Sequence, residues 1–307
     1  MTKISGSLFT GGDLAGAGAI AAGYSLAWGV ELDPAIAEVA NHNFSYGDRC
    51  HAASVVGFPW AKLDPVDHLH ISPPCTRASA ANNDRGETQL DLDLARASIE
   101  ALGVLLPSTV TLENVIGYRH FESFKVIVNE LYRLGYWPEW SIINAADVGV
   151  PQTRKRIILR AVRGGYLSPL PAPVEWVSWY SAIEDLIPSL PEAKLGDWQI
   201  AHLMKLVIGQ PVMIHANEQR SLKLRWVDEP AFTQTAGGDS ERAPGCNHKF
   251  LFPDGTVKRE TVRSKARIQS VPDWYDLSGC AVGLAQKILG NGVPSLLMQR
   301  IMGSLHP

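Results

Sequence analysis

A cysteine placed behind two prolines is the residue of this sequence whose position most clearly suggests chemistry. Cys75 follows Pro73 and Pro74 at the end of the apolar run VDHLHIS, residues 66–72. Two consecutive prolines stiffen the backbone and remove two hydrogen-bond donors, so the next residue is held in place. A free thiol becomes a nucleophile when its surroundings favour the thiolate. The pattern therefore indicates a presented thiol, although a single cysteine is more often an inert buried side chain.

A glycine turn and two carboxylates follow other apolar runs in the first half of the chain. Gly11-Gly12 follows the first run, Glu31 the second, and Glu113-Asn114 the run STVTL. Glycines let a backbone approach a nucleotide-type ligand, and an acidic residue about twenty positions further on can hold ribose hydroxyls. Glu31 is twenty residues past Gly11. An ordinary tight turn and an exposed strand-end charge are the alternatives at these two positions.

Short β-type runs alternate with helical patterns in the first half of the chain. The β-type runs are 4–9, 24–30, 66–72 and 108–112, later joined by 139–145 and 156–162. Helices are predicted from Asp33 as N-cap, over 92–106 and over 121–135. This alternation predicts an α/β fold with a doubly wound, mostly parallel sheet. Ligands bind at the carboxyl ends of the strands in such sheets, so the glycine turn, Cys75 and both carboxylates are expected at one rim.

Length and composition indicate a globular chain. It has 307 residues, of which 46% are hydrophobic and 19% charged, which is enough to bury a full core. No apolar run reaches the roughly 18 residues that span a bilayer, and no secretory apolar region precedes the first glycines, so a cytosolic protein is expected. The four cysteines (50, 75, 246 and 280) form no CxxC pair, and neither a metal site nor a disulfide scaffold is expected.

The second half of the chain has a less regular sequence pattern than the first. The proline-rich stretch 167–176 resembles a linker, and the residues up to about 262 show only weak periodicity. Although the whole chain has a net charge of −3, residues 220–267 contain ten Lys and Arg against six Asp and Glu. This local excess suits a phosphate-contacting face, and an ordinary solvated surface would account for it equally well.

Taken in order, the motifs resemble the DNA cytosine-5 methyltransferase family over nearly the whole chain. The matching stretches are SLFTGGDLAGAGAIAAGY (7–24), ELD (31–33), SPPCTRAS (72–79), ENV (113–115), DVGVPQTRKRIIL (147–159), RSKARIQSVPDWY (263–275) and GNGVPSLLMQRI (290–301). The resemblance implies a Rossmann-like methyltransferase sheet with a second, smaller and irregular target-recognition domain. The catalytic domain is then expected over 1–164 plus 263–307, and the target-recognition domain over 165–262.

The resemblance also implies a reaction: transfer of a methyl group from S-adenosylmethionine to C5 of a cytosine flipped out of DNA. The thiolate of Cys75 would add covalently to C6 of the base. Glu113 would contact N3 and the exocyclic amine, and Arg156 would hold O2. Arg154 would support the loop or a phosphate. The products would be 5-methylcytosine and S-adenosylhomocysteine.

Further contacts are implied for the cofactor and the DNA. The expected cofactor-binding residues are Phe9, Gly11, Asp13, Glu31, Ser54, Pro74 and Asn291. The expected DNA contacts are Arg77, Ser79, Lys223, Arg225 and Arg242. The sequence departs from the family pattern at Asp13, where a glycine is usual, and at Thr76 and Ala78, where glutamine and phenylalanine are usual. The resemblance also implies a residue that contacts the adenine amine of the cofactor. Ser54 is expected in this role, and Asp48 is a second candidate.

The implied partner is double-stranded DNA, bound without a metal by a monomeric, cytoplasmic protein of bacterial or phage origin. A functional pairing with a cognate restriction nuclease is left open. The alternatives are a tRNA cytosine-5 methyltransferase and a non-catalytic DNA-binding relative. The tRNA branch typically carries Cys-Phe-Thr late in the chain, whereas Cys280 precedes Ala281-Val282. A zinc-dependent cytidine deaminase is excluded, because Ala78 stands where its PCxxC signature needs cysteine.

Overall fold

The computed structural model describes residues 2–44, 49–74, 86–203, 209–216, 222–236 and 248–305. The chain divides into two compact units, the first comprising Met1–Asn144, Lys155–Ala172 and Gly292–Pro307, and the second Ala145–Arg154 and Pro173–Asn291. This is a division by packing, and the functional domain boundaries expected from the sequence stay a prediction. No helix of the described ranges is long and apolar enough to cross a membrane.

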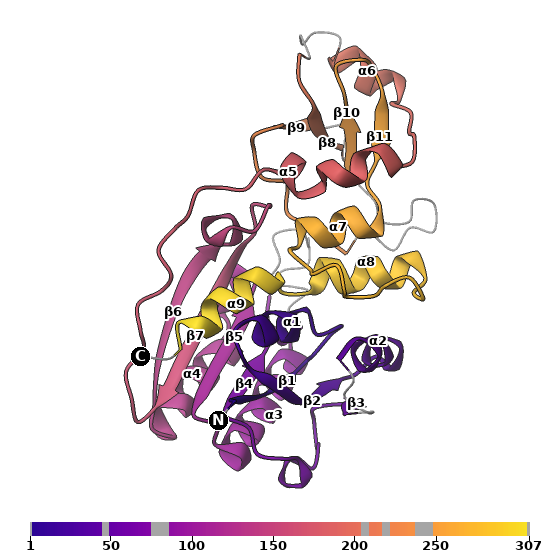
Figure 1. Cartoon of the computed structure of the whole chain (residues 1–307). Coiled ribbons are helices and arrows are strands. Elements are labelled where there is room, and N and C mark those ends of the chain that lie inside the picture. The colour runs from indigo at the N-terminus through magenta and orange to yellow at the C-terminus, as the bar shows by residue number, and fades with distance from the viewer. Residues whose placement is uncertain are drawn as a thin grey trace. The chain divides into compact units, whose positions relative to one another are not determined.

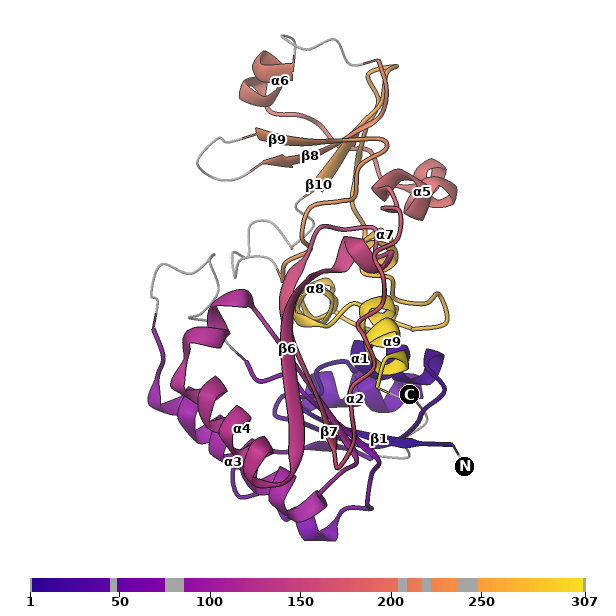
Figure 2. The same ribbon diagram turned by 90° about the vertical axis from the view of Figure 1, so that its left-hand side faces the viewer.

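The first unit is built on a seven-stranded sheet (Figure 1). Its elements are β1 Ile4–Leu8, α1 Leu14–Ala21, β2 Ser25–Glu31, α2 Pro34–Phe44, β3 Cys50–Ala52, η1 Trp60–Lys62, β4 His68–Ile71, α3 Gln89–Leu105, β5 Thr109–Asn114, η2 Ile116–His120, α4 Glu122–Arg133, β6 Tyr136–Asn144, β7 Lys155–Arg163 and α9 Ser295–Gly303. The strand order is β3-β2-β1-β4-β5-β7-β6. Helices α3 and α4 cover one face of the sheet and α1, α2 and α9 the other (Figure 2).

The predicted fold class is confirmed, because the first five strands of that order pair in parallel. Their apolar residues are buried on both sides, and Leu8, Ile71 and Leu112 join the core between the sheet and helices α3 and α4. The sequence did not predict the short strand β3. It also did not predict that β7 inserts antiparallel between β5 and β6.

The strand order creates a switch point next to β1. The chain moves outward from β1 through β2 to β3 on one side, and from β4 to β5 on the other. Helices on opposite faces therefore diverge at the carboxyl ends of β1 and β4, which is where doubly wound sheets bind ligands. The glycine turn follows β1, Pro73 and Pro74 follow β4, and Glu113 ends β5, so they lie at neighbouring strand ends.

The second unit contains a four-stranded antiparallel sheet and is more regular than predicted. Its elements are η3 Ala145–Val148, α5 Trp179–Ile183, η4 Glu184–Ser189, α6 Asp197–Leu203, β8 Val212–Ala216, β9 Leu222–Trp226, β10 His248–Leu251, β11 Val257–Arg259, α7 Val262–Ile268 and α8 Val282–Asn291. The strand order is β11-β10-β8-β9. Trp179 stacks on Phe250 at a ring-centroid distance of 5.1 Å, and Met213 and Ile268 complete this core.

Candidate active site

The turn between β1 and α1 combines a left-handed backbone with open space at Gly11. Phe9, Gly11 and Asp13 have φ angles of 58°, 58° and 57°, in the left-handed region. A Cβ atom added at Gly11 would meet no other atom within 4 Å, so this position faces open space. Phe9 packs against the edge of the main core. The glycine therefore permits both the left-handed backbone and a close approach from outside.

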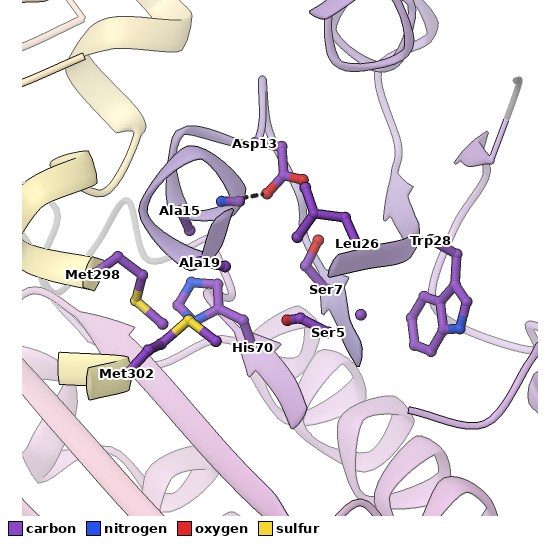
Figure 3. A pocket seen from close by; sticks show the side chains of 12 residues that line it. Ser5, Ser7, Asp13, Ala15, Ala19, Leu26, Trp28, His70, Met298 and Met302 are labelled. Atoms are coloured by element: carbon purple, nitrogen blue, oxygen red, sulfur yellow. Dashed lines mark hydrogen bonds between the residues drawn. The ribbon is translucent and has the colours of Figure 1, made fainter. Parts of the chain in front are cut away.

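Asp13, the departure from the family pattern, has a structural role. Its Oδ1 accepts a hydrogen bond of 2.9 Å from the N–H of Gly16, which caps the start of α1 (Figure 3). The side chain is only 1% exposed and lines a small internal pocket. Aspartate suits this position because it tolerates the left-handed region and caps helices well. Its contact with the cofactor stays a prediction.

Glu31 connects the glycine turn to the start of α2. Its Oε2 accepts the N–H of Gly11 at 2.8 Å, and its Oε1 accepts the N–H of Asp33 at 2.9 Å. The carboxylate is partly exposed at the end of β2. Ser54, just beyond β3, is exposed and accepts the N–H of Val56 at 3.1 Å. Gly11, Glu31 and Ser54 thus lie at the ends of three adjacent strands, which fits a nucleoside-type ligand.

The remaining expected cofactor residues, Pro74 and Asn291, belong to different units. Pro74 is exposed just beyond β4, in the first unit. Asn291 is exposed at the end of α8, in the second unit. Its role in closing the cofactor site stays a prediction.

The expected nucleophile lies outside the described residues. Cys75, Thr76, Arg77, Ala78 and Ser79 all fall in the gap after Pro74, and Asp48, Arg242 and Cys246 fall in other gaps. Cys50, which is described, is buried. Burial, together with the charges of Asp13 and Glu31, raises the pKa of the Cys50 thiol to about 12. Cys50 therefore stays protonated at neutral pH and cannot act as a thiolate nucleophile.

Glu113 and Arg156 form an ion pair at the end of β5. Oε1 of Glu113 lies 3.0 Å from Nε of Arg156, and the two side chains are 6% and 14% exposed. The pair forms because β7 runs antiparallel beside β5, which brings two residues far apart in sequence into contact. Burial lowers the pKa of Arg156, and the charge of Glu113 acts in the opposite direction. The arrangement holds a carboxylate and a guanidinium together where a planar polar ligand could meet both.

Two polar residues to which the sequence analysis gave no role in the site tie β4 to β5. The hydroxyl of Ser72 donates to Oε2 of Glu113 at 3.1 Å. The Nδ2 of Asn114 donates to the carbonyl of Pro73 at 2.9 Å. Asn114 lies inside the quoted ENV motif. Ser72 opens the quoted SPPCTRAS motif, and only the pairing of Ile71 with Leu112 in the structure reveals that it reaches Glu113.

Arg154 belongs to the second unit and is 2% exposed. Its Nη1 donates to the carbonyl of Gln234 at 2.8 Å, and its Nη2 to the carbonyl of Gly290 at 3.1 Å. Gln152, also buried, donates to the carbonyl of Ile268 at 3.1 Å. Arg154 thus holds two backbone carbonyls of its own unit, and both roles expected for it stay predictions.

The expected DNA-contacting residues of β9 differ in their surroundings. Lys223 is exposed. Arg225 makes an ion pair of 3.0 Å with Glu229 and lies 4.9 Å above the ring of Phe232. Lys223 is therefore the better placed of the two for a phosphate. Among the residues that the structure describes, no group of three or more His, Cys, Asp or Glu side chains could hold a metal ion.

Comparison with known proteins shows which family the sequence matches. Residues 5–306 match the family described as C-5 cytosine-specific DNA methylase. The type II methyltransferase M.AplI of Arthrospira platensis is 30% identical over 245 residues, which cover 76% of this chain and 66% of that protein. M.NmeDI of Neisseria meningitidis serogroup C is 24% identical over 97% of this chain and 82% of its own length. The match spans only 53% of M.BspRI of Lysinibacillus sphaericus, at 27% identity over 67% of this chain.

Solved structures share the fold. A DNA modification methyltransferase encoded within an E. coli prophage has a TM-score of 0.71 and 18% identity, covering 99% of this chain and 98% of that chain. The S. pombe Dnmt2 methyltransferase has a TM-score of 0.65 and 15% identity, with the same coverage of 99% and 98%. The order of the motifs, the polar residues at adjacent strand ends and the match over 5–306 together show that the chain belongs to the C-5 cytosine-specific DNA methylase family.

Proposed function

We propose that the chain transfers a methyl group from S-adenosylmethionine to C5 of a cytosine flipped out of double-stranded DNA, giving 5-methylcytosine. The observation that carries this proposal is the Glu113–Arg156 ion pair, which lies beside the strand end that leads into Pro73-Pro74-Cys75. A cytosine offers an amine, a ring nitrogen and a carbonyl along one edge. A carboxylate next to a guanidinium is complementary to that edge.

Cys75 is the proposed nucleophile. C5 of cytosine is a weak nucleophile until the Cys75 thiolate forms a bond to C6, which moves the electrons of the C5–C6 double bond onto C5. When bound, S-adenosylmethionine supplies the methyl group as an electrophile for that carbon. A base then removes the C5 proton, and the C–S bond breaks to release Cys75. Flipping the base costs a few kcal/mol, which contacts in the site must offset.

Glu113 suits the role of holding the amine side of the base. Its Oε1 is buried and accepts no aligned hydrogen bond within the described residues, although Arg156 lies close by. A buried acceptor left without a donor is unfavourable, so a donor such as an exocyclic amine would be bound strongly there. The guanidinium of Arg156, 3.0 Å from the same carboxylate, could reach O2 of the base.

The cofactor fits the turn after β1. Open space at Gly11 leaves room for close backbone contact, and the partly exposed carboxylate of Glu31 is available to ribose hydroxyls. The start of α1 lies next to this turn. We also propose that the protein is monomeric and cytoplasmic. Its functional partner would be a cognate restriction nuclease.

The test is expression in a bacterial host that lacks cytosine methylation, followed by bisulfite sequencing of its DNA. We expect cytosines in one short sequence context to resist conversion. Cys75→Ser should abolish this protection, whereas Cys280→Ser, a matched change at a partly exposed cysteine, should retain it. Complete conversion of the DNA with soluble wild-type protein present would overturn the proposal. Modified cytosine in the tRNA of the same cells would then identify the RNA alternative.

A further inference from the structure

We propose that Ser72 is a positioning residue for Glu113 in methyl transfer, and that its hydroxyl sets the orientation of the carboxylate that grips the base. This inference rests on the proposed function. The Ser72 hydroxyl donates to Oε2 of Glu113 at 3.1 Å. Arg156 approaches the other oxygen, Oε1, at 3.0 Å. The two oxygens of one carboxylate are thus held from two different sides.

The hydroxyl supplies the directional part of this arrangement. Oε1 of Glu113 makes the ion pair with Arg156 but no aligned hydrogen bond. Among the described residues, Ser72 thus makes an aligned hydrogen bond to this carboxylate. The terminal torsion of a glutamate is broad and roughly two-fold, so an ion pair alone leaves the carboxylate plane poorly fixed. The Ser72 hydrogen bond fixes that plane and leaves Oε1 available to the substrate.

Strand register determines where the Ser72 side chain lies. Ser72 follows Ile71, which pairs with Leu112, so it lies beside Glu113 on the neighbouring parallel strand. The N–H of Ser72 donates to the carbonyl of Leu8 at 3.4 Å. Because a residue before proline is restricted to extended backbone, Pro73 further limits the conformations open to Ser72.

A second hydrogen bond joins the ends of β4 and β5 in the opposite direction. Ser72 donates from β4's end to the side chain of Glu113, while Asn114 donates from the end of β5 to the carbonyl of Pro73 at 2.9 Å. The carboxylate that holds the base and the backbone that leads to Cys75 are therefore fixed to each other. A displacement of Glu113 would change its distance from the segment that carries the nucleophile, and small displacements of reacting groups are costly in rate.

The experiment compares Ser72→Ala with Ser72→Thr, which keeps the hydroxyl. Single-turnover methyl transfer is measured with enzyme in excess over a methylatable DNA duplex and radiolabelled S-adenosylmethionine, together with the dissociation constant for the duplex. We expect Ser72→Ala to slow the methyl-transfer step by about tenfold or more, as for the loss of a hydrogen bond to a charged group. DNA affinity should be unchanged, and Ser72→Thr should recover most of the rate.

Ser98→Ala is the matched control, since its buried hydroxyl donates only within α3, to the carbonyl of Leu94 at 2.9 Å. Its rate should equal that of the wild type. Thermal unfolding of each variant separates a folding defect from a slower chemical step. A wild-type rate in Ser72→Ala would overturn the inference while leaving the proposed function intact, and so would equal losses in folded Ser72→Ala and Ser72→Thr. A wild-type protein inactive on every duplex would overturn both.

Discussion

The carboxylate of Glu113 and the guanidinium of Arg156 are mostly buried, and each compensates for the charge of the other. Placing a charge in a protein interior is unfavourable unless an opposite charge or hydrogen bonds compensate for the lost hydration. The two residues stand on the neighbouring antiparallel strands β5 and β7, and their side chains are 6% and 14% exposed. The Glu113–Arg156 ion pair, which is proposed to bind the substrate, therefore also contributes to the stability of the fold.

We expect Arg156→Met to lower the free energy of unfolding by about 3 kcal/mol, because it leaves the Glu113 carboxylate buried without its counter-charge. Chemical denaturation at neutral pH measures this change. The double variant Glu113→Leu/Arg156→Met should recover much of the loss, since it removes both charges. Arg133→Met is the control. It breaks the pair between Glu130 and an Arg133 side chain that is 69% exposed, and it should leave the unfolding midpoint close to that of the wild type. Equal behaviour of the two single variants would show that the Glu113–Arg156 pair is hydrated.

At the scale of elements, the first helix is positioned by the last. Gly18 of α1 packs directly against the backbone of α9, and a Cβ atom there would collide with the carbonyl of Ser295. The hydroxyl of Ser295 donates in turn to the carbonyl of Leu14 at 2.9 Å. The glycine turn precedes α1, so the C-terminal helix helps to hold the proposed cofactor site in place.

We expect Gly18→Ala to destabilise the protein by about 1–3 kcal/mol, the usual cost of overpacking a close contact. Gly103→Ala offers the opposite outcome in the same unit, because a Cβ at this exposed position of α3 meets nothing within 4 Å. It should stabilise the protein by roughly 0.5–1 kcal/mol through better helix propensity. Thermal denaturation of both variants measures the difference. A stabilising Gly18→Ala would mean that α1 and α9 can separate without cost.

At the scale of the whole molecule, a buried histidine makes stability depend on pH. His70 of β4 shares a hydrogen bond of 2.9 Å with the hydroxyl of Thr111, and its Nε2 has no hydrogen-bond partner within the described residues. It lines the internal pocket together with Asp13, Met298 and Met302 (Figure 3). Burial lowers the pKa of His70 from 6.5 to about 4. The folded protein therefore holds this side chain neutral while the unfolded chain protonates it.

The full stability is present above pH 6.5 and is lost as the pH falls towards 4, because only the unfolded state takes up the proton in that range. We expect His70 to account for a loss of about 3 kcal/mol across this interval. Denaturation of His70→Asn at several pH values should show a correspondingly shallower dependence. His42→Asn, at an exposed position near the end of α2, should retain the wild-type slope. An unchanged slope in His70→Asn would place the pH dependence in other groups.

Local signals in the sequence determined the class of fold and most of what stands at the strand ends. Apolar runs separated by capped helical patterns predict a doubly wound sheet, since periodicity and capping act over only a few residues. The same reasoning placed the glycine turn, Glu31 and Glu113 at the carboxyl ends of strands, and the structure confirms these positions. The motifs, taken in order, also indicated the family, because each motif is a short pattern of neighbouring residues that can be read directly from the sequence.

The tertiary structure alone decided how these residues meet. The insertion of β7 between β5 and β6 brings Arg156 to Glu113, and the register of β4 on β5 brings Ser72 to the same carboxylate. Asp13 is a buried helix cap in a left-handed conformation, a structural role that the sequence did not reveal. Each of these outcomes depends on pairing between segments distant in the chain. The register of such pairing depends on burying one whole face of each strand against the core. Short local sequence patterns do not contain this information.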